Sequence, residues 1–62
     1  MKLNIRNIEN VIARFETGGR VVDRVAAKEL GRVLMNENIE FLTATDACEH
    51  YASRIWNAGL VK

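Results

Sequence analysis

The chain offers few side chains for catalysis. Its single cysteine, Cys48, and its single histidine, His50, lie two positions apart. A nucleophilic thiol needs a base within hydrogen-bonding distance. On a helix, side chains two positions apart point about 200° away from each other. Cys48 and His50 therefore cannot meet within one chain, and we predict no catalytic residue and no enzymatic activity.

Metal and cofactor sites are not expected either. One cysteine and one histidine cannot make a Cys/His zinc site or a disulfide within one chain. Gly18-Gly19 is too short to resemble a phosphate-binding loop. Asp46 and Glu49 suit the start of a helix without any catalytic role. We also expect a chain of this size to lack a pocket of about 300 Å³.

A row of basic residues is the most informative feature for function. It consists of Arg20, Arg24, Lys28 and Arg32, each four positions from the next. On a helix these side chains would share an arc of about 120° with no acid inside it. Arg20 belongs to the row only if the helix starts early. Such a row can hold phosphates, meet an acidic protein surface, or simply face solvent.

Apolar residues beside this row favour a protein partner. Val25 and Met35 lie within or next to the same arc. Protein interfaces are enriched in Arg and Met, whereas a track for phosphates needs no apolar residues. We therefore predict that a larger protein with an acidic patch binds here, with Val25 and Met35 at the dry centre. The predicted partner-binding residues are Arg20, Arg24, Val25, Lys28, Arg32 and Met35.

Three helices must position these side chains. The first is predicted over residues 5–16, with Asn4 as its N-cap, Leu3 and Ile8 as a hydrophobic staple, and Gly18-Gly19 as its exit. Its apolar arc contains Ile5, Ile8, Val11, Ile12 and Phe15, and Arg6, Asn7, Asn10 and Arg14 lie opposite.

The second helix is predicted over residues 21–37, or from Asp23 if that residue is the cap. Gly31 costs about 1 kcal/mol relative to alanine, which indicates a close helix crossing. Asn36 and Asn38 are suitable ends, since Asn tolerates the left-handed conformation. The predicted apolar arc contains Val22, Ala26, Leu30, Val33 and Leu34.

The third helix is predicted over residues 46–58, capped by Thr43 or Thr45 and stopped by Gly59, with Leu60 folding back on Ile55. Its apolar face contains Cys48, Tyr51, Ala52, Ile55 and Trp56, whereas His50 lies on the solvated face. Residues 38–44 connect the second and third helices. A short pairing of residues 2–5 with residues 39–41 is the alternative to a plain linker.

These elements predict a single all-α domain spanning residues 1–62, with a helical hairpin followed by a third helix. In 62 residues, hydrophobic burial and the entropy of ordering the chain roughly cancel. We therefore expect a homodimer that shares a core, with Tyr51, Ile55 and Trp56 at the dimer interface. A marginally stable three-helix monomer is the alternative.

DNA binding is the second hypothesis. The spacing of Ala27 and Gly31 is typical of the first half of a helix-turn-helix motif. That motif has apolar residues one, six and nine positions after the glycine, where this chain has Arg32, Glu37 and Glu40. Asp46 and Glu49 would also face phosphate from the third helix. Nucleic acid is therefore our second choice of partner.

Composition and charge complete the prediction. The net charge is +1, and no stretch is apolar enough for a signal peptide or a membrane span. With its lone cysteine, we expect a cytoplasmic protein that does not bind membranes. The predicted function is a small non-enzymatic regulator that binds a protein stoichiometrically. By size class alone, it would suit a phage or mobile-element inhibitor or modulator of host machinery.

Two alternatives to that function stay open. One is a dimeric helical DNA-binding transcriptional regulator that uses the basic face of the second helix on phosphates. Steep loss of DNA affinity with salt would distinguish it from a protein binder. The other is a subunit of a larger assembly, which would form higher oligomers without any second protein.

Overall fold

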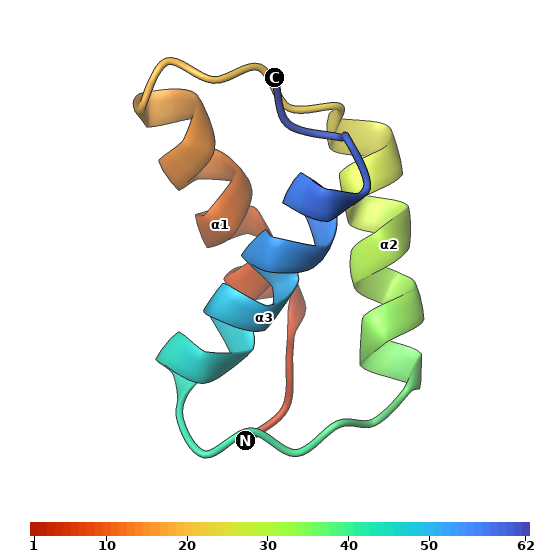
Figure 1. Cartoon of the computed structure of the whole chain (residues 1–62). Coiled ribbons are helices and arrows are strands. Elements are labelled where there is room, and N and C mark those ends of the chain that lie inside the picture. Colours follow the sequence, from red (N-terminus) through yellow and green to blue (C-terminus); the bar gives the residue numbers. More distant parts are fainter.

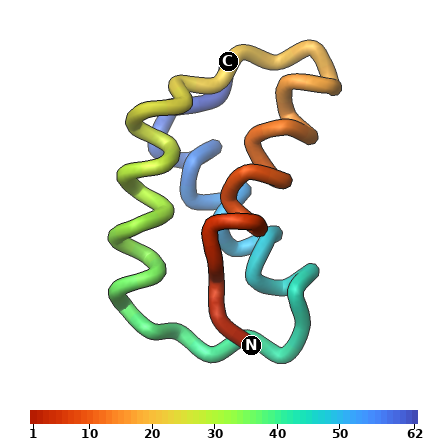
Figure 2. The backbone as a smooth tube through the Cα atoms, turned by 180° about the vertical axis from the view of Figure 1, so that it is seen from behind, coloured from red at the N-terminus to blue at the C-terminus, as the bar shows by residue number.

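Three helices make up most of the chain: α1 (Ile5–Thr17), α2 (Arg24–Asn36) and α3 (Ala44–Asn57). The computed structural model describes residues 1–62. In Figure 1, α3 crosses in front of α1, with α2 alongside, and Figure 2 shows α1 and α2 from behind. Each helix packs on the other two. The prediction of an all-α three-helix domain is confirmed, because the only β feature is an isolated bridge between Val22 and Val61.

The start of α1 is fixed by a reciprocal cap. The Asn4 side chain accepts a hydrogen bond from the Asn7 backbone N–H at 2.9 Å, and the Asn7 side chain accepts one from the Asn4 N–H at 3.2 Å. Leu3 and Ile8 are both buried, as the predicted staple requires. Asn7 was expected on the solvated side of α1, and that was wrong. It is buried because its side chain closes the cap.

The ends of the helices confirm the predicted stops. Gly19 and Gly59 have φ values of 87° and 76°. Arg20 N–H donates to Phe15 C=O at 3.0 Å, and Leu60 N–H donates to Ile55 C=O at 3.1 Å. These bonds are the 6→1 bonds of a Schellman motif. After α2, Asn38 takes a φ of 60°, which is the left-handed conformation expected of an asparagine there.

The buried side of α2 agrees with the predicted arc only in part. Leu34 is buried and Leu30 packs against the core, as predicted, whereas Val33 is 53% exposed. Ala27 and Gly31, outside the predicted arc, are buried. The helix begins at Arg24 after Asp23 as N-cap, so residues 20–23 form an extended connection instead of a first helical turn. Gly31 faces inward because Ile8 of α1 occupies the space that a β-carbon would need.

The closest approach joins α1 to α2 at Gly31. A β-carbon at this position would lie 2.5 Å from Ile8 Cδ1 and 2.9 Å from Ile8 Cγ1. Ile8 is fully buried and β-branched, so it has little freedom to move away. The predicted close helix crossing at Gly31 is therefore confirmed.

Tyr51 joins α3 to α2. Its hydroxyl donates a hydrogen bond of 2.6 Å to the Ala27 carbonyl, and its side chain is fully buried. A buried phenol needs such a partner, because an unpaired hydroxyl in an apolar core costs free energy. Burial and the charge of Glu9 raise the pKa of Tyr51 from 10.0 to about 12.

The two connections are held by main-chain bonds. Val21 and Lys62 exchange two hydrogen bonds, of 3.0 and 2.8 Å, so the last residues lie on the α1–α2 connection. In the α2–α3 connection, Phe41 N–H donates to Met1 C=O at 2.6 Å. The alternative of pairing residues 2–5 with residues 39–41 is wrong. Phe41 bonds to Met1, which precedes the segment 2–5, and neither segment forms a strand. Phe41 is half-buried and Leu42 is 91% exposed.

None of the helices combines the length and the apolar composition needed to cross a membrane.

The close crossing predicts that Gly31→Ala destabilises the fold. The added methyl clashes with Ile8, which outweighs the better helix propensity of alanine and gives a net loss of about 1–2 kcal/mol. Ile8→Val removes Cδ1, so it should recover part of this loss in the double variant. Gly18→Ala is the matched control, because its nearest atoms lie 3.5 Å away and its φ is −78°. Denaturant unfolding measures all four variants, and equal stability of Gly31→Ala and wild type would contradict the crossing.

Tyr51 predicts a loss of stability at high pH. The unfolded chain releases the phenol proton near pH 10, whereas the folded chain keeps it until its pKa of about 12. The folded state therefore holds more protons between these values, so stability is complete below pH 10 and falls as the pH rises towards 12. Tyr51→Phe should cost about 1–2 kcal/mol at neutral pH and should remove this part of the pH dependence. Tyr51 is the only tyrosine, so tyrosinate absorbance reports the ionisation of this residue alone. A pKa near 10 for the folded chain would contradict the predicted loss of stability at high pH.

Candidate functional site

The predicted basic row does not form one free surface. Arg24 Nε lies 3.6 Å from Glu16 Oε2, and Lys28 Nζ lies 3.0 Å from Glu9 Oε1. Both acids belong to α1, so these cations connect α2 to α1 along the seam between the helices. The sequence has no acid within the row on the same helix, but its periodicity does not show which acids of a neighbouring helix lie beside the row.

The other two members of the row lie apart. Arg20 precedes α2, and its guanidinium lies over the Trp56 ring at 4.7 Å from the centroid. Arg32 is exposed on α2 and takes part in none of the ion pairs. The prediction of a continuous row of four cations is therefore wrong, because the helix starts after Arg20.

Val25 and Met35, predicted together at the dry centre of the partner interface, differ in exposure. Val25 is 73% exposed, whereas Met35 is half-buried and packs against the hydrophobic core. Met35 is thus largely used within the chain, and Val25 is the member of the pair that a partner could contact.

Two of the three residues predicted at a dimer interface are unavailable to a second chain. Tyr51 and Ile55 have no exposed surface, because α1 and α2 cover them within one chain. These two residues thus belong to the core of one chain, and the homodimer stays a prediction. Trp56, at the end of α3, is 46% exposed and is the exception.

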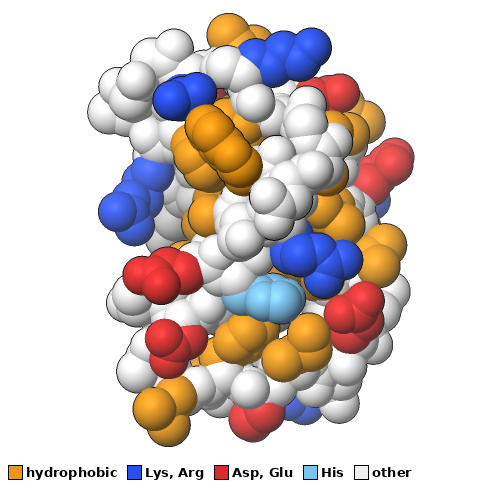
Figure 3. Space-filling model, in the orientation of Figure 1, with side chains coloured by type: hydrophobic (Ala, Val, Ile, Leu, Met, Phe, Trp, Pro, Cys, Tyr) orange, Lys and Arg blue, Asp and Glu red, His pale blue; other side chains and the backbone are white.

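Trp56 belongs to a surface cluster that we call the aromatic patch, made of Phe15, Arg20 and Trp56. The Phe15 and Trp56 rings are stacked, with their centroids 6.1 Å apart and their planes at 23°. Arg20 covers the indole. Figure 3 shows an orange hydrophobic area in the upper part of this face with blue side chains beside it. The patch is therefore an ordered arrangement of two aromatic rings and a cation.

Three segments build the aromatic patch. Phe15 lies near the end of α1 and Trp56 near the end of α3. Gly19, in the left-handed conformation, turns the chain so that Arg20 reaches the indole. The sequence predicts both aromatic residues on core faces. This is confirmed for Phe15, which is half-buried and packs against the core, and is wrong for Trp56, which is 46% exposed. The available clue for Trp56 was that it precedes the Gly59 stop by only three residues.

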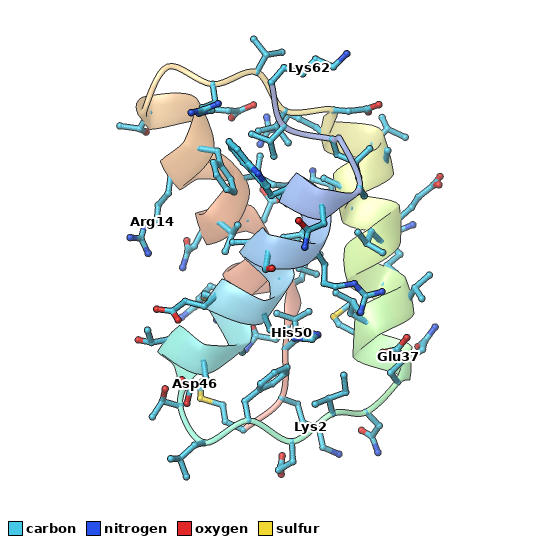
Figure 4. All side chains as sticks on the ribbon, viewed as in Figure 1. Lys2, Arg14, Glu37, Asp46, His50 and Lys62 are labelled. Atoms are coloured by element: carbon cyan, nitrogen blue, oxygen red, sulfur yellow. The ribbon has the colours of Figure 1, made fainter.

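The surroundings of the patch are basic. Figure 4 shows Arg14 and Lys62 in the half of the molecule that carries the patch, and Glu37 and Asp46 in the other half. Glu16 pairs with Arg24, and the Asp23 carboxylate caps α2. Arg14, Arg20 and Lys62 take part in none of the ion pairs, so an acidic partner could pair with these side chains.

A groove runs beside the aromatic patch, between α1 and α3. One hollow has a volume of about 520 Å³ and is lined by Asn7, Asn10, Val11, Arg14, Phe15, Ala44, Thr45, Cys48, Glu49 and Ala52. A neighbouring hollow of about 610 Å³ extends it to Thr17 and Gly18. The expectation that so small a chain lacks such a volume was wrong, because diverging helices leave open space at the surface. We refer to both hollows together as the α1–α3 groove.

Cys48 and His50 face different neighbours. Cys48 is half-buried and lines the α1–α3 groove. The His50 ring lies 5.2 Å from that of Phe41, and its Nε2 atom is buried without a hydrogen-bond partner. His50 was expected on a solvated face, which was wrong, because Phe41 of the connection folds over it. Nowhere do three potential metal-ligating side chains of His, Cys, Asp or Glu come together.

No protein-family model, curated protein or solved structure matches this chain. Its function is therefore inferred from the surface that the fold presents.

The contact of Arg20 with Trp56 predicts charge-selective quenching. Trp56 is the only tryptophan, so all indole fluorescence arises from the patch. Because a cation lies over the ring, the ratio of the iodide to the acrylamide quenching constant should be higher than for an indole without a nearby charge. Arg20→Gln should lower the iodide quenching constant about twofold. Arg32→Gln is the matched control and should leave it unchanged. An equal effect of both substitutions would show that Arg20 does not cover the indole.

Proposed function

We propose that this protein is a small non-enzymatic regulator that binds stoichiometrically to an acidic patch on a larger protein, and that the aromatic patch is its contact surface. The observation that carries the proposal is Trp56, which is 46% exposed while stacked on Phe15 and covered by Arg20. Tryptophan and arginine are the residues most enriched among those that dominate binding energy at protein interfaces.

The order within the patch supports a binding role. An exposed indole free to rotate would lose conformational entropy on binding. In this chain the indole already contacts the Phe15 ring and the Arg20 guanidinium. Binding then needs little further ordering, so more of the contact energy is available as affinity.

Charge supports an acidic partner over a second copy of the chain. In a symmetric dimer the same patch meets itself. Arg14 and Arg20 would then approach their own counterparts, and like charges in contact oppose association. A homodimer, which we expected from the sequence, would also have to form without Tyr51 and Ile55. Carboxylates on a different protein would compensate the same arginines.

Nucleic acid is less well supported. Binding to phosphates needs several cations along one track. Arg24 and Lys28 are paired with acids of α1, and Arg20 lies over an aromatic ring on another face. Arg32 remains as the free cation of α2. The alternative of a DNA-binding regulator that uses the basic face of α2 therefore loses the feature that favoured it.

Capture from lysate of the native cell tests the proposal. The immobilised wild-type chain should retain one protein in a stoichiometric amount, identified by mass spectrometry. Trp56→Ser and Arg20→Glu should each reduce its capture at least about tenfold, because they remove the indole or reverse the charge over it. Val25→Asp and Arg32→Glu change the exposed face of α2 and serve as matched controls. They should leave capture unchanged.

Two results would contradict the proposal. If Val25→Asp abolished capture and the patch variants did not, the contact surface would be the outer face of α2. If the chain instead retained DNA with an affinity that falls steeply with salt, the partner would be nucleic acid. Circular dichroism of each variant verifies that the fold is intact.

A further inference from the structure

The α1–α3 groove lies next to the aromatic patch, and Phe15 belongs to both. We propose that this groove holds an amphipathic helix of the partner protein, with an apolar ridge in the groove, an acidic flank towards α1 and a basic flank towards α3. This inference rests on the proposed function and adds the form and chemistry of the segment that binds.

The floor of the groove suits an apolar ridge. Val11 and Phe15 contribute from α1, and Cys48 and Ala52 from α3. Ala44, Cys48 and Ala52 line the groove from α3 at every fourth position, with Thr45 and Glu49 beside them. The three small side chains leave room for the backbone of an incoming segment.

The walls of the groove favour a helix over an extended peptide. An extended peptide gains affinity by pairing its main chain with a free strand edge. Both walls here are helices, and the one β bridge of the chain joins Val22 to Val61 outside the groove. A helix satisfies its own main-chain groups, so it needs no strand edge to bind here. From Asn7 to Gly18 the groove follows α1 for about 16 Å, the length of about three helical turns.

Charges of opposite sign on the two walls define the flanks of the occupant. Arg14 lines the groove from α1, and Glu49 lines it from α3. Neither takes part in the ion pairs of the chain, which involve Met1 with Glu40, Arg24 with Glu16, and Lys28 with Glu9. Figure 4 shows Arg14 and Asp46, which is near the start of α3, projecting on the same side of the molecule. Complementary flanks are thus acidic towards α1 and basic towards α3.

Three synthetic helices serve as probes. Each has about 14 residues and the same leucine ridge. The first has glutamates on one flank and lysines on the other, the second has glutamates on both flanks, and the third has lysines on both. Cys48 is the only thiol of the chain and lines the groove, so its rate of alkylation by a maleimide reports occupancy. The mixed helix at saturation should slow alkylation at least tenfold, and the other two should protect Cys48 less.

Charge reversal makes the test specific. Arg14→Glu should shift the preference towards the helix with lysines on both flanks. Glu49→Lys should shift it towards the helix with glutamates on both flanks. Arg6→Glu changes an exposed residue of the same helix, α1, outside the groove. It is the matched control and should keep the wild-type preference for the mixed helix.

Three results would overturn this inference. The first is that none of the helices protects Cys48. The second is equal protection by all three, unaltered by Arg14→Glu and Glu49→Lys, which would indicate general hydrophobic adhesion. The third is protection of Cys48 on raising the concentration of the chain alone, which would identify the occupant as a second copy. Any of these results would refute the helix-binding role of the groove. The proposed function would still stand if capture of the partner depends on Trp56 and Arg20, so failure of the inference and failure of the proposed function are distinguishable.

Discussion

The structure depends on how α2 packs against its two neighbours, with Gly31 against Ile8 of α1 and the Ala27 carbonyl bonded to Tyr51 of α3. At Gly31 the absence of a β-carbon leaves room for Ile8 of α1. One turn earlier, the Ala27 carbonyl accepts the hydroxyl hydrogen of Tyr51 from α3. Together these two contacts fix which side of α2 faces inward. They therefore also determine which residues of α2 are exposed.

Closing the core in this way determines what is left for a partner. Tyr51 and Ile55 are fully covered within one chain, and the apolar side chains that remain exposed include Val25 and Val33 on α2 and Trp56 near the end of α3. Trp56 lies where α3 ends and the Gly19 turn brings Arg20 across the indole. The α1–α3 groove arises for a related reason, since the two helices diverge from their crossing and leave one side open. The aromatic patch and the groove are thus consequences of how three short helices close one small core.

Local features of the fold were predictable from the sequence, whereas most relations between helices were not. The Asn4 cap and the glycine stops depend on neighbouring residues and on backbone conformation, so their residue types identify them. The crossing at Gly31 was predictable because a glycine within a helix indicates a close contact, although its partner Ile8 was not identified. The orientation of α2 depends on which residues its neighbours bring, and the predicted arc was shifted so that Val33 was placed inside. The pairing of Arg24 with Glu16 and the position of Arg20 over Trp56 join residues of different segments. No periodicity within one helix contains that information, and for this reason the basic row was mistaken for a free surface.

The central claim is that Trp56, ordered by Phe15 and Arg20, is the residue that a protein partner covers. The most direct measurement is the fluorescence of this single tryptophan while the purified chain is titrated with the protein that it captures. We predict that the emission moves to shorter wavelength and that iodide loses access to the indole, with saturation at one partner per chain. Full binding by an independent measure, with unchanged emission and unchanged iodide quenching, would contradict the account.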